Sequence, residues 1–180
     1  MVSRGRVLWP LAVLLAAWPG AADDDPFSGT YAMKGMTTDV RSGDSRRIDG
    51  HIVLSLKGEV YRAASELTTD FPTPGGAVHA DVIGTGEGKR EGDTLKGTAH
   101  TQVVMQTAPG VDPNFAFIPR QVGPRIRSSW TARLEKDGTL VVELSNKPEK
   151  GEQYRETTTK LRGTRVAMPG QAKPAAPTAP

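Results

Sequence analysis

The side chains best suited to acid–base or metal chemistry are three histidines, His51, His79 and His100. Each lies in a segment where apolar and polar residues alternate, as they do along a half-buried strand. This alternation places His51 and His100 on the polar, outward side. His79 and Asp81 share one strand face, roughly 6–7 Å apart, and could offer two ligands to a metal. A catalytic zinc site uses three protein ligands, so we predict no metal site.

Patterns for nucleophilic or phosphate chemistry are absent from the sequence. It contains no Gly-x-Ser-x-Gly, His-Glu-x-x-His or P-loop motif. Glycines cluster at residues 84–88, but no helical pattern follows them, so we interpret the cluster as a bend in a strand. The chain has no cysteine, which excludes disulfides and thiolate metal sites. We therefore predict a protein that is not an enzyme, with no catalytic residue and no cofactor; a barrel enzyme using Tyr61, Glu156 or Arg162 inside its cavity is left open.

The charge of the chain gives little reason to expect a nucleic-acid partner. Its 180 residues carry 23 basic and 20 acidic side chains, a formal charge of +3. Without the first 22 residues the counts become 21 and 20, which leaves the rest near neutral and predicts no nucleic-acid binding. Arg125, Arg127 and Arg133 form a basic stripe, which we interpret as a solvated face.

The two ends of the chain differ in composition from its middle. Residues 1–22 resemble a signal peptide, with Arg4 and Arg6, an apolar run at residues 7–18, and small residues before Ala22. The apolar run is shorter than the roughly 20 residues of a transmembrane span. We expect cleavage near Ala22 and a secreted or periplasmic protein without a transmembrane segment. Residues 167–180 are rich in Pro and Ala and predict a disordered tail, which leaves residues 25–166 as a single domain.

The middle of the chain is typical of strands joined by tight turns. Turn sequences occur at Lys57-Gly58, Gly92-Asp93 and Asp137-Gly138. Short connections require antiparallel neighbours, and closing the sheet removes its two exposed edges. We therefore predict an all-β fold, a single antiparallel up-and-down β-barrel of about eight strands, with a β-sandwich as the alternative. The predicted strands are residues 27–36, 48–56, 59–69, 78–89, 94–107, 125–134, 139–144 and 153–166.

Many of the inward positions carry small residues, such as Gly50, Ala63, Ser65, Ala99 and Ala132. An eight-stranded barrel is wide enough either to be filled by side chains or to hold one small ligand. If it is hollow, the protein binds an apolar small molecule, with residues 108–123 as a binding loop. If it is filled, the protein is a structural or interaction protein of the cell envelope. The predicted ligand-binding residues are Tyr31, Met33, Tyr61, Met105, Phe115, Phe117 and Trp130.

Residues 27–31, Phe-Ser-Gly-Thr-Tyr, resemble the Gly-x-Trp signature that begins the first strand of lipocalins and related calycin barrels. Tyr31 stands where those families usually have Trp. The resemblance implies an eight-stranded barrel with one end closed by Gly29, Tyr31 and an arginine of the last strand. It places Arg162 in that closing role, in a segment that also contains Arg165. It also implies binding of small hydrophobic molecules.

Overall fold

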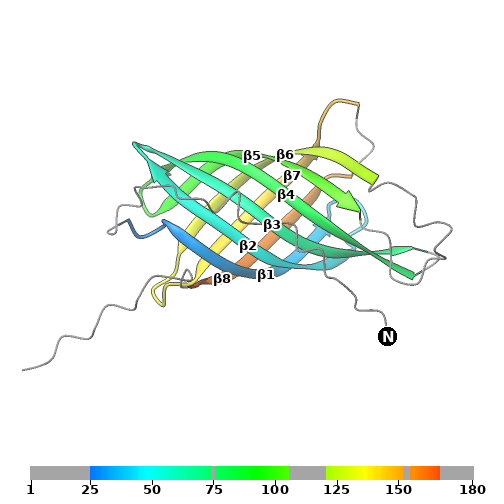
Figure 1. Ribbon diagram of the computed structural model, residues 1–180, viewed down its shortest axis with the longest axis horizontal. Coiled ribbons are helices and arrows are strands. Elements are labelled where there is room, and N and C mark those ends of the chain that lie inside the picture. The colour runs from blue at the N-terminus through cyan, green and yellow to red at the C-terminus, as the bar shows by residue number, and fades with distance from the viewer. Residues whose placement is uncertain (1–24, 74–75, 106–120, 152–154, 167–180) are drawn as a thin grey trace, which may run out of the picture.

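The computed structural model describes residues 25–73, 76–105, 121–151 and 155–166 (Figure 1). The predicted signal peptide, the predicted tail, and Phe115 and Phe117 lie outside these residues. The described chain forms eight strands: β1 (Gly29–Asp39), β2 (Ser45–Lys57), β3 (Val60–Thr73), β4 (Gly76–Glu91), β5 (Thr94–Met105), β6 (Gln121–Leu134), β7 (Leu140–Pro148) and β8 (Thr157–Val166).

The eight strands close into one up-and-down barrel in sequence order (Figure 1). Every neighbouring pair is antiparallel, and the first strand pairs with the last from Thr30 opposite Val166 to Asp39 opposite Thr157. The predicted barrel is therefore confirmed, and the sandwich alternative is wrong. Within the described ranges, no helix is long and apolar enough to cross a membrane.

The core follows the alternation of the sequence. On β6, Ile126, Ser128, Trp130 and Ala132 are buried, while the residues between them are exposed. The same period of two places Leu140 and Val142 of β7 and Leu161 of β8 inside. Because successive side chains of a strand point to opposite faces, the inward residues of the eight strands together form the core.

Several strands extend further than their apolar pattern predicts. β2 begins at Ser45 rather than residue 48, β6 begins at Gln121 rather than 125, and β7 continues to Pro148 rather than 144. These extensions lie at the end of the barrel where the β1–β2 turn connects the strands, which we call the mouth. Polar side chains such as Arg46 and Asn146 occupy the inward positions there, so apolar and polar residues no longer alternate.

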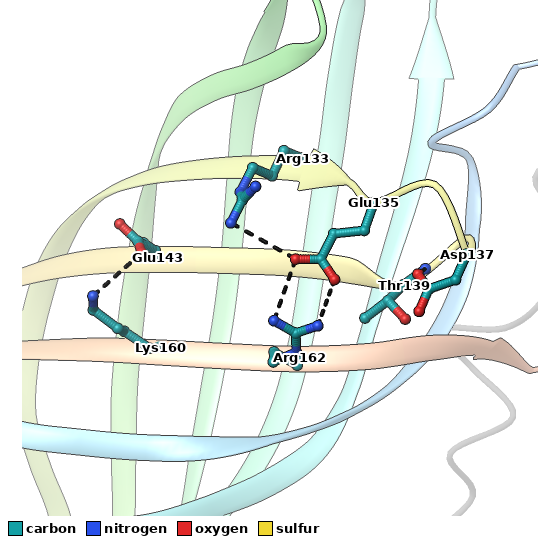
Figure 2. A network of polar contacts seen from close by, with 7 residues as sticks. All are labelled: Arg133, Glu135, Asp137, Thr139, Glu143, Lys160 and Arg162. Carbon is teal, nitrogen blue, oxygen red and sulfur yellow. Dashed lines mark hydrogen bonds and ion pairs between the residues drawn. The ribbon is translucent and has the colours of Figure 1, made fainter.

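Several ion pairs lie on the outer face of β6, β7 and β8 (Figure 2). Glu135 accepts hydrogen bonds from both terminal nitrogens of Arg162, and Arg133 lies 3.7 Å from the same carboxylate. Val141 stands opposite both arginines in register and is only 8% exposed, although its side chain is on the outer face. We attribute this burial to the aliphatic stems of the two arginines, which can cover apolar surface.

Candidate functional site inside the barrel

One end of the barrel is closed by the ring of Tyr31, which is fully buried. Arg165 stands opposite Tyr31 in register on β8, with its guanidinium carbon 5.6 Å from the ring centroid. The phenol donates a hydrogen bond to the Phe27 carbonyl over 3.0 Å, and Arg165 donates to the phenol oxygen over 3.2 Å. A Cβ at Gly29 would lie 2.9 Å from Arg165 Nε, so the glycine leaves room for the arginine.

Arg165, and not Arg162, therefore takes the position over Tyr31. The prediction for Arg162 is wrong because its side chain lies on the outer face, where it pairs with Glu135. The period of two explains the difference, since buried Leu161 fixes residues 163 and 165 as inward. Glu156 is also exposed, so neither of these two residues supplies a catalytic group to the interior.

The rest of the closed end is built from the segment that precedes β1. Phe27 packs edge-on against Tyr61 of β3, with ring centroids 5.9 Å apart. Asp25 accepts a hydrogen bond from the Tyr61 phenol and another from the Ser28 amide. Ser28 Oγ in turn accepts one from the Leu56 amide. Residues 25–28 thus form a plug that ties the entry of β1 to β2 and β3.

The plug leads to a prediction about alkaline pH. Burial, together with the hydrogen bond to the Asp25 carboxylate and its negative charge, raises the pKa of the Tyr61 phenol to about 12. An unfolded tyrosine ionises near pH 10. The neutral phenol therefore stabilises the fold fully below about pH 10, and this contribution is lost as the pH rises towards 12.

We expect absorbance titration to show one tyrosine ionising close to pH 12, and Tyr61→Phe to remove that step. A wild-type titration in which every tyrosine ionises near pH 10 while the protein remains folded would contradict the assigned environment of Tyr61.

Beyond the plug, a small apolar cavity of about 40 Å³ lies beside Trp130. Its walls include Leu54, Ala63, Ala99 and Val142. The indole is 5% exposed and packs onto glycine backbone, because a Cβ at Gly88 or Gly97 would come within 2.6 Å of it. Among the described residues, the buried Trp130 Nε1–H has no hydrogen-bond acceptor. An unsatisfied donor of this kind costs about 1–3 kcal/mol.

A second interior cavity, also about 40 Å³, lies towards the mouth and has a mixed lining. Apolar Ile48 and Leu67 face it together with Arg46, Thr37 and further hydroxyl groups. Ser65 and Leu144 line both cavities, so the two adjoin. The interior is therefore apolar beside Trp130 and polar towards the mouth.

Asn146 of β7 organises the polar part of the interior. Its Nδ2 donates to the Thr157 and Thr159 hydroxyls over 3.1 and 3.0 Å, and its Oδ1 accepts from Ser128 Oγ over 2.7 Å. Thr159 then donates to Thr37 of β1 over 3.0 Å. One side chain therefore connects four strands through hydroxyls that are themselves buried, and a satisfied network of this kind rigidifies the wall that carries it.

We expect Asn146→Ala to lower the free energy of unfolding by about 2 kcal/mol, since three buried hydroxyls lose a partner. Urea denaturation measures the change, and the slope of the unfolding free energy against urea concentration should stay the same. The control is Ser145→Ala, at the neighbouring exposed position, which should change stability by less than about 0.5 kcal/mol. Equal effects of the two substitutions would contradict the role of the network.

The predicted ligand-binding residues are only partly brought together. Tyr31, Met33, Tyr61 and Trp130 are all buried in the interior core. Trp130 lines the apolar cavity, whereas the other three line neither of the two interior cavities. Met105 ends β5, and its side chain lies outside the described part of the structure, as do Phe115 and Phe117.

Sequence reasoning missed three residues of the polar region, Arg46, Thr37 and Asn146. Extending the alternation would have found them, because Arg46 continues the inward series of Ile48 and Asn146 that of Leu144. The spacing of these residues indicated an inward position, whereas their polar side chains are typical of an outward one.

The histidines lie on the outer surface. His79 Nδ1 is 2.8 Å from Asp70 Oδ1, its cross-strand neighbour, and His100 Nδ1 is 2.9 Å from Glu149 Oε1. Within the described ranges, no group of three His, Asp or Glu side chains is placed to hold a metal ion.

The fold and its interior define a closed eight-stranded β-barrel with one plugged end and two small adjoining cavities. Comparison with models of known protein families gives no match, and comparison with curated proteins gives none either.

Proposed function

We propose that this is a secreted or periplasmic small-molecule-binding protein, similar in design to lipocalins, that holds an apolar ligand inside its barrel. The observation that carries the proposal is the buried Trp130 N–H, which lacks an acceptor and belongs to a residue lining an apolar cavity. The arginine packed over Tyr31 at the plugged end supports the resemblance to lipocalins. Barrel architecture alone would not establish a function.

The cavity restricts the ligand to a small or slender molecule. A volume of about 40 Å³ has room for about three water-sized groups. An apolar molecule with a single hydrogen-bond acceptor would fill this space and satisfy the indole N–H. We therefore expect a short acyl chain or a compound of similar width, admitted from the mouth, since residues 25–28 close the other end.

Trp130 provides the readout for a binding experiment. In a chain that begins at Asp23 it is the only tryptophan, because the other two are Trp9 and Trp18. Its fluorescence would be titrated with fatty acids and methyl ketones of increasing length. We expect a saturable change for short members of the series, and an emission that stays flat across the whole panel would contradict an interior site.

Two neighbouring alanines provide a matched pair of variants. Ala63 faces inward and lines the apolar cavity, whereas Ala64 faces outward on the same strand. Ala63→Leu fills the cavity, and we expect it to weaken binding at least about tenfold, or 1.4 kcal/mol. Ala64→Leu should leave affinity unchanged. Thermal unfolding of both variants checks that the barrel remains folded, because overpacking alone costs about 1–3 kcal/mol; equal affinities would contradict the interior site.

A second candidate is a structural or interaction protein of the cell envelope with a filled barrel. The observation that favours it is cavity size, since about 40 Å³ in each cavity is far below the roughly 300–1,000 Å³ of common ligand pockets. Pull-downs from envelope extract with and without residues 171–180 would test it. A protein partner recovered alongside a flat fluorescence titration would support this second function over the first.

A further inference from the structure

Three nitrogen-bearing side chains form a row across the outer face of β5, β6 and β7. His100 stands directly opposite Arg127, and Arg127 directly opposite Lys147. Neighbouring strands lie about 4.8 Å apart, so the row places all three residues within about 10 Å. The side chains of His100 and Lys147 are 71% and 65% exposed, and Arg127 is exposed as well.

Arg127, at the centre of this row, differs from those cations of β6 and β8 that pair with a carboxylate. Lys160 lies 3.4 Å from Glu143, its cross-strand neighbour, and Arg162 is bonded to Glu135 (Figure 2). Lys147 is opposite Arg127 instead, and like charges directly opposite each other destabilise a sheet. In the part of the chain that the structure describes, no carboxylate lies within ion-pair distance of Arg127.

The row also lines a groove on the surface. The groove has a volume of about 700 Å³, and Thr98, Ser129 and Ser145 add hydroxyl groups to it. An adjoining groove of about 590 Å³ shares His100 and Glu149 with the first and adds Arg125. Glu149 meets His100 at 2.9 Å, while Lys147 reaches Glu156 only at 3.9 Å. Two carboxylates therefore face the cations Arg125, Arg127, Lys147 and Lys150, which leaves an excess of positive charge.

We propose that this groove binds an anionic polysaccharide, a sugar chain that carries carboxylate, sulfate or phosphate groups. Charge complementarity supplies the attraction, and the serine and threonine hydroxyls suit a polymer rich in hydroxyl groups. Among the described residues that line the two grooves there is no Phe, Tyr or Trp, whereas single-stranded nucleic acid is held largely by stacking on such large rings. The proposal is independent of any ligand inside the barrel.

The test measures binding of the full chain to dextran sulfate, with uncharged dextran as the control polymer. The Arg127→Gln/Lys147→Gln variant removes the centre of the row. The Arg133→Gln/Lys160→Gln variant removes the same charge from the ion-paired part of the wall. At about 150 mM salt we expect the wild type to bind dextran sulfate and not dextran. We expect the first variant to bind at least about tenfold more weakly and the second to stay within about twofold.

Several results would overturn the proposal. These are the absence of binding to dextran sulfate, an equal loss in both double variants, and binding of a single-stranded oligonucleotide or of anionic phospholipid vesicles as tight as that of the polysaccharide. Stability separates a folding defect from a binding defect. Because the first variant removes a like-charge pair, its free energy of unfolding should be no lower than that of the wild type.

Discussion

Gly35→Ala is expected to lower the free energy of unfolding by about 3 kcal/mol or more by forcing β1 and β8 apart. Gly35 faces Leu161 across the pairing that closes the barrel. A Cβ at this position would lie less than 3.0 Å from the Lys160 carbonyl and the Leu161 Cα. Overpacking against side chains costs about 1–3 kcal/mol. Here the obstacle is backbone that is fixed by its own hydrogen bonds, so we expect the upper end of that range or beyond.

The control for this substitution is Gly43→Ala in the β1–β2 turn. A Cβ there would have no atom within 4 Å, and its φ of +78° leaves a strain of about 1 kcal/mol. Urea denaturation gives both stabilities, and amide hydrogen exchange locates the damage. For Gly35→Ala we expect loss of protection concentrated on β1 and β8. Uniform loss over all strands, or a cost equal to that of Gly43→Ala, would show that the closing pair is not the sensitive point.

Tyr31→Ala is expected to cost about 3–5 kcal/mol, the range for removing a large buried ring. The ring is fully buried, and Arg165 packs over it at 5.6 Å. Besides apolar contact, the substitution removes the hydrogen bond to the Phe27 carbonyl and the aromatic partner of the guanidinium, which is worth about 0.5–2 kcal/mol. We therefore also expect the plugged end to become accessible to a protease or to a hydrophobic dye.

Tyr31→Phe separates the ring from the hydroxyl. It keeps the packing and the guanidinium over the ring but removes the phenol's hydrogen bonds with the Phe27 carbonyl and with Arg165, which should cost about 1–2 kcal/mol. Urea denaturation of the two variants measures the difference between them. If Tyr31→Phe were as damaging as Tyr31→Ala, the hydrogen bond rather than the ring would be holding the end closed.

The fold was predictable from sequence because most strands carry an apolar face next to a recognisable turn. β6 is the clearest example, since Ile126, Trp130 and Ala132 alternate with exposed residues and are all buried. Asp137-Gly138 then connects it to β7, with Gly138 at a φ of +81°. An alternating apolar face and a tight turn, repeated along the chain, require neighbouring antiparallel strands. Closure of the sheet into a barrel is then favoured because it removes the exposed edges.

The interior was less predictable than the wall. Asn146 and Thr159 face inward, where a hydrogen bond between them satisfies both polar groups. Such a partner can be identified only once the register between the strands is known. The choice between Arg162 and Arg165 rested on Leu161, because most of the other residues of β8 are Thr, Arg or Lys. Cavity size depends on how side chains from opposite walls meet, and alternation within one strand carries no information about that.

The pairing of Thr30 with Val166 brings the entry of β1 and the exit of β8 to the same rim, the one sealed by residues 25–28. A fusion partner, affinity tag or surface linker joined directly to Asp25 or Val166 would therefore sit behind the seal and leave the mouth unobstructed. The same geometry makes the barrel suited to circular permutation, with a short linker joining Val166 to Asp25 and new ends opened at an exposed hairpin such as Gly138.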